Sequence, residues 1–208
     1  NGTAYVVEDF SIDVKKGECI AVVGASGSGK STLMNLIIGF LKPTEGTLYI
    51  DGNDITQLSL PDYRHFISVV PQNSILFAGT IRQNIVYGLE NVSNEQVERV
   101  AELANLNEFV KDLPKGLDTF VGEGGGKLSG GQKKRLNIAV ELIADPSLFF
   151  LDEPDSGLDG VMAASLMQNL RVIADEGKIV MVITHAPDRV AHLFDKVVVL
   201  AKSARTNS

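Results

Sequence analysis

The sequence predicts an α/β domain in which helices cover both faces of a largely parallel β-sheet. Two observations support this prediction. Short apolar runs rich in β-branched residues alternate along the chain with longer amphipathic stretches. These runs are apolar at almost every position, which is typical of strands buried on both faces of a parallel sheet. The 208 residues are enough to form one self-sufficient hydrophobic core.

The first half of the chain reads as a strand, a helix and two further strands, followed by a second helix. Strands are predicted over residues 19–23, 46–50 and 66–70. Helical spacing of apolar residues predicts a helix over 30–40, and an Asn/Ser start with the same spacing predicts another over 94–106. The residues expected on the buried face of the first helix are Leu33, Leu36, Ile37 and Phe40.

The second half repeats the alternation. Helices are predicted over residues 129–144, 160–175 and 187–194. Strands are predicted over residues 147–151, 179–183 and 196–200. The residues expected on the buried face of the helix over 129–144 are Leu136, Ala139, Val140 and Ile143. No linker is rich enough in Pro, Ser or Gly to separate two independent domains.

Composition and charge exclude several classes of protein. Hydrophobic residues make up 44% of the chain and charged residues 22%, without low-complexity tracts, so disordered and fibrous classes are excluded. Nineteen basic and 26 acidic residues give a net charge of −7, the wrong sign for neutralising nucleic-acid phosphates. The single cysteine, Cys19, predicts a buried strand thiol in a reducing compartment. No apolar stretch approaches the ~20 residues of a membrane-spanning helix.

The loop after the first predicted strand matches a phosphate-binding pattern. Residues 24–31, GASGSGKS, fit G-x-x-x-x-G-K-[ST], the loop of P-loop NTPases. Its glycines let backbone N–H groups point into one concavity at a helix N-terminus, where β- and γ-phosphate oxygens can bind. Lys30 adds a positive charge between these phosphates, and the Ser31 hydroxyl is placed for Mg²⁺. The residues predicted to contact the nucleotide are Gly24, Ala25, Ser26, Gly27, Ser28, Gly29, Lys30, Ser31 and Thr32.

An acid pair, Asp152 and Glu153, follows the apolar run over 148–151. A buried parallel strand that delivers a carboxylate beside the phosphate loop supplies what Mg²⁺ coordination needs, and Asp152 takes this role. Glu153 would then be aimed at the γ-phosphate and could activate an attacking water. A solvated acid pair at a strand end is the alternative, and the preceding phosphate loop makes it the weaker one.

A second Gly-rich segment, Leu128–Gln132 (LSGGQ), precedes a long predicted helix. Physically it is an N-cap serine followed by two glycines, a second helix N-terminus suited to an anion. With this motif the chain resembles, over nearly its whole length, the ATP-binding cassette of ABC transporters. In that family two cassettes dimerise head to tail, and the signature of one caps the γ-phosphate held by the other. The resemblance assigns this nucleotide contact to Ser129, Gly131 and Gln132.

The order of the motifs extends the resemblance to two further residues. Gln72, which follows Val70-Pro71, resembles the glutamine that touches Mg²⁺ and the attacking water. His185, at the end of an apolar strand, resembles the histidine that bonds to the γ-phosphate. Taken alone, these residues would be an ordinary loop amide and a surface histidine. With them, the expected catalytic residues are Lys30, Gln72, Glu153 and His185, and the expected Mg²⁺ ligands are Ser31, Gln72 and Asp152.

The resemblance also implies a domain organisation, cofactors and partners. Residues 1–208 form a single ATPase domain, with a core of 1–72 and 146–208 and a helical signature subdomain of about 73–145. The cofactors are ATP and Mg²⁺. The partners are a second nucleotide-binding domain, bound head to tail in the presence of ATP, and the separate transmembrane domain of a transporter, without nucleic acid. The expected location is cytoplasmic, at the cytoplasmic face of a membrane through the membrane-domain partner.

The sequence departs from the family pattern in two places. The family stacks adenine on an aromatic residue upstream of the phosphate loop, but Tyr5 and Phe10 align too close to Lys30, so we expect that residue to precede Asn1 in a longer chain. From Asp9 to Gln132 the chain resembles exporter cassettes, whereas the part after the signature resembles another branch of the family. A natural intermediate and an engineered chimera both fit this second departure.

Three functions fit the sequence. The first is an ATPase that energises transport through a membrane partner. A non-transport cassette acting on chromosomes or ribosomes is disfavoured by the net charge of −7 and by the lack of a coiled-coil insertion or a second cassette. An engineered cassette with little or no turnover is the third. Because Glu153 and His185 are both present, loss of turnover would have to come from missing context.

Overall fold

The computed structural model describes residues 6–73, 75–185 and 191–201. The strands are β1 Cys19–Gly24, β2 Tyr49–Ile50, β3 Asn53–Asp54, β4 Ile67–Val70, β5 Leu148–Asp152, β6 Ile179–Ile183 and β7 Lys196–Leu200. The α-helices are α1 Lys30–Ile38, α2 Leu60–Arg64, α3 Ile81–Ile85, α4 Asn94–Leu103, α5 Asn107–Val110, α6 Gly130–Leu142 and α7 Gly160–Asp175. Short 3₁₀ turns lie at Ile55–Gln57, Gly116–Asp118, Glu123–Gly125 and Ala191–Leu193.

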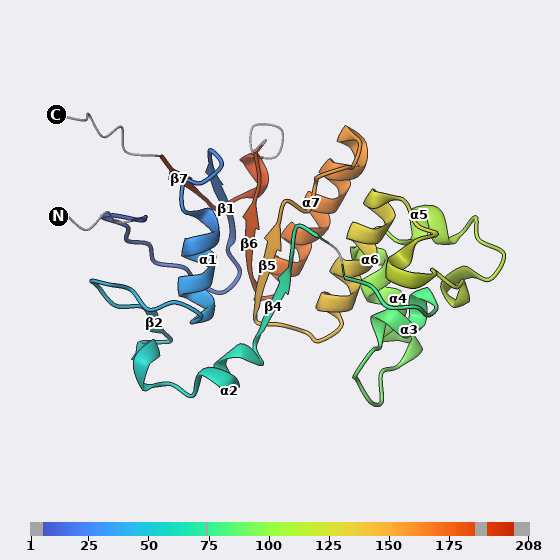
Figure 1. Cartoon of the computed structure of the whole chain (residues 1–208), viewed down its shortest axis with the longest axis horizontal. Coiled ribbons are helices and arrows are strands. Elements are labelled where there is room, and N and C mark those ends of the chain that lie inside the picture. The colour runs from blue at the N-terminus through green and yellow to red at the C-terminus, as the bar shows by residue number, and fades with distance from the viewer. Residues whose placement is uncertain (1–5, 74, 186–190, 202–208) are drawn as a thin grey trace.

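Five strands form one sheet in the order β4-β5-β6-β1-β7, and every pair of neighbours is parallel. The prediction of an α/β fold with a parallel sheet flanked by helices is therefore confirmed (Figure 1). All five strands end at the same edge of the sheet, so the loops that follow them meet there.

Alternating side chains of the strands face two separate hydrophobic cores. On one face, residues such as Cys19, Phe149 and Leu151 pack with α6 and α7. On the other face, their neighbours Ile20 and Phe150 pack with residues of α1. This alternation follows from the two-residue period of a strand, and it explains why the runs are apolar at every position. Figure 1 shows the same arrangement, with α1 on one side of the sheet and α6 and α7 on the other.

The buried position in a strand that was predicted for Cys19 is also confirmed. Its side chain is 1% exposed in β1, and burial raises the pKa of the thiol to about 12. A thiol that remains protonated at neutral pH is a poor nucleophile, so Cys19 acts as a small core residue.

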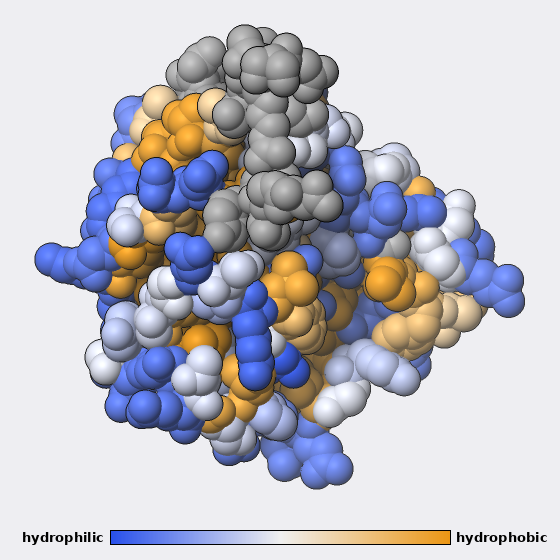
Figure 2. Space-filling model, turned by 60° about the vertical axis from the view of Figure 1, so that its left-hand side comes forward, coloured by the Kyte–Doolittle hydropathy of each residue, from blue (hydrophilic) through white to orange (hydrophobic). Residues whose placement is uncertain are grey.

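The first predicted helix ends two residues earlier than expected. Gly39 takes a left-handed conformation (φ 80°) and its N–H bonds back to Leu36, which closes the helix after Ile38. Phe40 therefore leaves the helix, and its side chain is 63% exposed instead of buried. Figure 2 shows apolar surface in several patches with hydrophilic residues between them, which is ordinary for a protein surface.

The strand predicted over 46–50 is shorter than expected and does not belong to the five-stranded sheet. Only Tyr49–Ile50 is extended, and it pairs antiparallel with β3 in a separate hairpin. Asp51 and Gly52 both have positive φ angles at the turn, which suits a tight two-residue hairpin and excludes this segment from the parallel sheet. Helices α2, α3 and α5 were not predicted, because each is only four or five residues long. Of the helix predicted over 187–194, residues 187–190 lie outside the described residues, and Ala191–Leu193 forms a 3₁₀ turn.

Helices α3, α4, α5 and α6 lie side by side, away from α1 (Figure 1). The buried surface of α6 is wider than the predicted apolar face, because the helix packs against β4 on one side and against α3 and α4 on other sides. Leu136 and Ala139 are buried as expected, whereas Val140 and Ile143 are only partly buried. Two basic residues of α6, Lys134 and Arg135, are buried instead. None of the helices in the described ranges is both long and apolar enough to cross a membrane.

Candidate nucleotide-binding site

The phosphate loop connects β1 to α1 at the carboxyl edge of the sheet. Its last glycine, Gly29, is the N-cap of α1 in a left-handed conformation (φ 101°), and no side chain caps this helix. The first N–H groups of α1 therefore remain available to an anion. Lys30 is 9% exposed, and its ammonium donates to the carbonyl oxygens of Gly24 (2.7 Å) and Ala25 (3.0 Å), which holds it over the loop.

Close packing explains why the loop needs a glycine at its start. A Cβ atom at Gly24 would lie 2.4 Å from the Leu200 carbonyl oxygen and 2.4 Å from Ser28 Oγ. The Ser28 hydroxyl is itself buried and has no hydrogen-bond partner among the described residues. A buried polar group without a partner is uncommon and points to a ligand or water at this place.

A cavity of about 200 Å³ lies against the loop. Its lining residues are Val6, Gly27, Gly29, Lys30, Ser31 and Thr32. Phe10 does not line it and instead packs against the core on the α1 side of the sheet, while Tyr5 lies outside the described residues. Phe10 is therefore no stacking platform for an adenine base.

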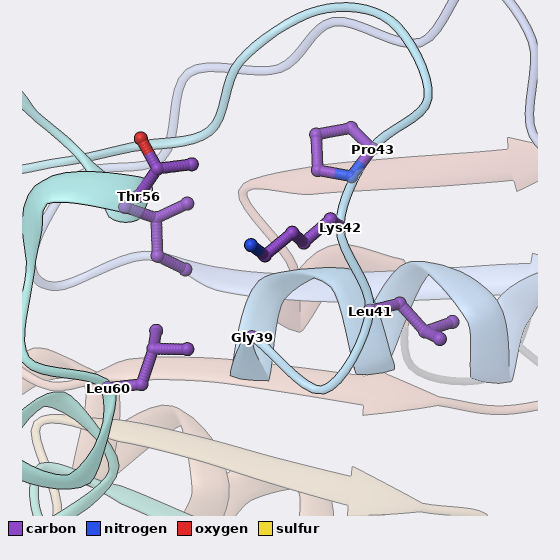
Figure 3. Close-up of a pocket in the computed structure, with 7 residues that line it drawn as sticks. Gly39, Leu41, Lys42, Pro43, Thr56 and Leu60 are labelled. Carbon is purple, nitrogen blue, oxygen red and sulfur yellow. The ribbon is translucent and has the colours of Figure 1, made fainter.

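A second cavity, of only about 30 Å³, lies at the other end of α1. It is lined by Gly39, Leu41, Lys42, Pro43, Ile55, Thr56 and Leu60, and the Lys42 side chain extends across it (Figure 3). This space is about the size needed for a single water. It is a packing gap, too small for a nucleotide.

Three of the predicted catalytic residues meet at the ends of neighbouring strands. Gln72 follows β4, Glu153 follows β5 and His185 follows β6. The Gln72 Nε2 donates to Glu153 Oε2 at 2.9 Å, and His185 Nε2 lies 2.6 Å from Glu153 Oε1. Glu153 is 19% exposed and His185 is 52% exposed, so the group is open to solvent on the His185 side.

The backbone of Glu153 has an unusual conformation. Its φ angle is +50°, in the left-handed region that is costly for a residue with a Cβ. A hydrogen bond from Glu153 N to the Ile183 carbonyl at 2.8 Å helps to hold it there. The cost, on the order of 1–3 kcal/mol, must be offset by the surrounding structure, which makes Glu153 a candidate functional residue.

Asp152 lies at the end of β5 among other charges. Burial raises the pKa of its carboxyl, and the neighbouring Glu153 raises it further. The positive charges of Lys134 and Lys30 act in the opposite direction. A divalent cation bound here would favour the ionised carboxylate in the same way.

The residues fit Mg²⁺ only together with a phosphate ligand. In the described part of the chain, no group of three or more His, Cys, Asp or Glu side chains could hold a metal ion. Mg²⁺ is typically held by one or two protein oxygens, substrate phosphates and water, so such a cluster is not required. Asp152 and the Ser31 hydroxyl at the start of α1 offer suitable oxygens.

The signature segment is capped by its own side chains. Ser129 Oγ accepts from Gln132 N at 3.2 Å, and Gln132 Oε1 accepts from Ser129 N at 2.9 Å, which together form a capping box. A Cβ at Gly131 would lie 2.8 Å from Leu158 Cδ2, so this glycine permits close packing against the turn after β5. No hydrogen bond or ion pair within the described ranges links the segment to the phosphate loop of the same chain.

Two contacts near this site involve residues outside the motifs found in the sequence. The Thr184 hydroxyl donates to Asp155 Oδ2 at 3.2 Å. The buried Lys134 ammonium donates to the carbonyl oxygens of Pro71 (3.4 Å) and Gln72. Burial lowers the pKa of Lys134, and the charges of Asp152, Glu153 and Asp155 oppose this shift. A lysine within a helix gives no signal in the sequence that its ammonium is buried.

The fold and the site define a P-loop NTPase, because a Gly-rich loop joins a central parallel strand to a helix and an acid pair ends a nearby strand. The family model of the ABC transporters matches residues 7–156, and the chain belongs to this family as an ABC nucleotide-binding domain.

The similar proteins are ABC exporters. The chain is 40% identical over 197 residues to a putative multidrug export ATP-binding/permease protein of Staphylococcus aureus strain bovine RF122 / ET3-1, and 39% identical to that of strain NCTC 8325. These alignments cover 95% of the chain but 34% of each relative. A bacterial Atm1-family ABC exporter with ATP bound has the same fold, with a TM-score of 0.83 and 37% identity over 94% of this chain and 34% of that one. The chain thus spans about a third of the length of these relatives.

Proposed function

We propose that the chain binds Mg²⁺-ATP and hydrolyses it to energise transport through a transmembrane domain. The contact between Glu153, Gln72 and His185 is the observation that carries this proposal, since two separate loops hold one carboxylate in a fixed place. Lys30, the open N-terminus of α1 and the phosphate loop bind the triphosphate. The relatives support transport, because their names describe multidrug export and an ATP-bound exporter.

Glu153 activates the attacking water. Its carboxylate accepts a proton from the water as the water oxygen bonds to the γ-phosphorus, and the bond from that phosphorus to the ADP oxygen breaks. Each carboxylate oxygen has two acceptor positions, so the contacts to Gln72 and His185 leave room for this proton. His185 and Lys30 would face the γ-phosphate. Ser31, Gln72 and Asp152 would hold Mg²⁺, which would supply charge neutralisation at the phosphates.

ATP acts between two copies of the domain. Ser129, Gly131 and Gln132 at the N-terminus of α6 complete the nucleotide site of a second copy arranged head to tail. The Ser129 oxygen accepts a hydrogen bond within its own helix, so its O–H remains able to donate to a phosphate oxygen. The domain works at the cytoplasmic face of a membrane, where its transmembrane partner holds it.

The substitution Glu153→Gln tests this function. It keeps the shape and the contact to Gln72 but removes the carboxylate that accepts a proton. Steady-state ATP turnover should fall by several hundredfold or more, within the ~10²–10⁴ range for loss of a general base, while the dissociation constant for ATP changes little. The control is Glu98→Gln on the exposed face of α4. Turnover that survives Glu153→Gln, or a wild-type chain that binds ATP without turnover, would overturn the proposal.

A further inference from the structure

Lys134 is a buried cation that the proposed mechanism does not use. Its side chain leaves α6, the helix that begins with the signature motif, and is 4% exposed. The neighbouring buried cation, Arg135, bonds to the carbonyl oxygens of Asn105 (2.8 Å) and Gly131 (3.3 Å), away from the loop that follows β4. Lys134 instead reaches the segment that follows β4. Burying an ammonium is costly, so its acceptors deserve a functional explanation.

The acceptors of Lys134 are backbone carbonyls of Gln72, the residue that contacts Glu153, and of the preceding Pro71. The ammonium donates to the carbonyl oxygens of Pro71 and Gln72. The Gln72 side chain then donates to Glu153 Oε2 at 2.9 Å, and His185 contacts the other carboxylate oxygen at 2.6 Å. Gln72 therefore links α6 to the carboxylate at the end of β5, because its backbone carbonyl accepts from Lys134 and its side-chain amide donates to Glu153.

Three nearby carboxylates favour a positive charge at the position of Lys134. The carboxylates of Asp152, Glu153 and Asp155 act on the Lys134 ammonium. Lys134 is not in direct hydrogen-bond contact with any of them, and its donors go to backbone carbonyls. It thus balances negative charge near the site while it fixes the position of the loop.

We infer that Lys134 is a positioning residue for ATP hydrolysis, which anchors the Gln72 backbone to the signature helix so that the Gln72 amide holds the Glu153 carboxylate in place. This inference rests on the proposed function. It also gives the signature helix a direct mechanical link to the water-activating group of its own chain. A movement of α6 when a second copy binds would be passed to Glu153 through Lys134 and Gln72.

The test compares Lys134→Met, Lys134→Arg and the control Lys133→Met, which removes the neighbouring lysine of the same helix. Lys134→Met keeps the apolar stem but loses the donors, so kcat should fall about 10–100-fold, in line with the cost of misplacing a catalytic group. The KM for ATP should change by less than about threefold, because the phosphate loop is untouched. Lys134→Arg keeps donors and charge and should recover most of kcat, and Lys133→Met should remain within about twofold of wild type.

Hydrogen exchange gives a readout that does not depend on turnover. The amides of Gln72 and Asn73 belong to the peptide groups whose carbonyls Lys134 binds, so they should exchange faster in Lys134→Met than in Lys133→Met. If Lys134→Met does not fold, Lys134→Gln replaces it, and kcat should still fall at least about fivefold, because the shorter neutral side chain loses one of the two acceptors.

The outcomes separate this inference from the proposed function. A wild-type chain without turnover overturns the function, and hydrogen exchange alone then decides whether Lys134 anchors Gln72. The inference is wrong if Lys134→Met keeps the wild-type kcat, if its defect lies in KM alone, if Lys134→Arg is as slow as Lys134→Met, or if exchange at Gln72 and Asn73 is unchanged.

Discussion

The two glycine-rich helix N-termini of this domain are built in opposite ways. At α1, the N-cap is Gly29 without a side-chain cap, so the N–H groups are left open beside a buried lysine and a cavity of about 200 Å³. At α6, Ser129 and Gln132 close the helix end with a reciprocal pair of hydrogen bonds. The sequence alone predicts two similar anion sites, because both segments combine glycines with a helix start.

The difference indicates which contacts each helix end can offer to a ligand without a second copy of the domain. The α1 end offers several unpaired backbone donors and a positive charge, which suits it to a triphosphate held by one copy of the domain, as proposed above. The α6 end has used the Ser129 and Gln132 N–H groups in its own cap, and it retains the Ser129 O–H and the exposed Gly130 backbone. Such an end suits a supplementary contact to a phosphate that another site already holds.

The largest effect in this comparison should follow from Lys30→Ala. The substitution removes a charge-assisted contact to phosphate at the open helix end, so the affinity for ATP should fall at least tenfold, about 1.4 kcal/mol. Lys42→Ala, on an exposed lysine after α1, serves as the control and should leave affinity unchanged. Equilibrium titration with ATP measures both variants. An unchanged dissociation constant for Lys30→Ala would mean that the open end is not the triphosphate site.

A smaller effect should follow from Ser129→Ala at the closed helix end. Loss of the capping box should lower the free energy of unfolding by about 1 kcal/mol, with ATP affinity of the monomer unchanged. Ser93→Ala removes the equivalent box from α4 and should cost about as much. Denaturant unfolding and ATP titration at low protein concentration test this prediction. A loss of monomer affinity specific to Ser129→Ala would show that the two helix ends share one nucleotide within a chain.

The smallest effect concerns Glu141, on the opposite end of α6 from the signature. Burial raises the pKa of its carboxyl, although hydrogen bonds from Ser68 and the Val69 backbone partly counter this shift. The pKa of Glu141 is therefore higher in the folded state than in the unfolded state. The contribution of this carboxyl to the free energy of unfolding is fully present below the unfolded-state pKa and is lost as pH rises through the folded-state pKa. Glu141→Gln should therefore raise the melting temperature at about pH 7.5 and leave it unchanged at about pH 4. Equal shifts at both pH values would refute this explanation.

The sequence predicted the parts of the fold that depend on local patterns. The strands over 179–183 and 196–200 and the helix over 160–175 were found at their bounds in the structure, because apolar runs and an N-cap Asp159 mark them clearly. Phe40 was misplaced, because the helical spacing continues past Gly39 although the glycine ends the helix. The hairpin of β2 and β3 depends on backbone conformation at Asp51 and Gly52, which composition alone does not specify.

The meeting of Gln72, Glu153 and His185 could be anticipated, since each follows a strand and parallel strands end at one edge. Their roles in hydrolysis and metal binding stay predictions. The Lys134 contact could not be anticipated, because it depends on how α6 packs against β4. The boundary of the helical subdomain at about 73–145 and the change of family branch after the signature stay predictions.

The most direct test of the central claim is the mass of the Glu153→Gln variant in Mg²⁺-ATP. If the α6 end of one copy completes the α1 site of another, slow hydrolysis should trap a dimer of twice the 22.3 kDa chain mass. Light scattering should show this dimer at protein concentrations on the order of 100 μM, which are needed when the 208-residue domain is tested by itself. Adding Ser129→Arg should return the protein to a monomer with unchanged ATP affinity. A Glu153→Gln variant that binds ATP but stays monomeric, or a dimer that survives Ser129→Arg, would contradict the account.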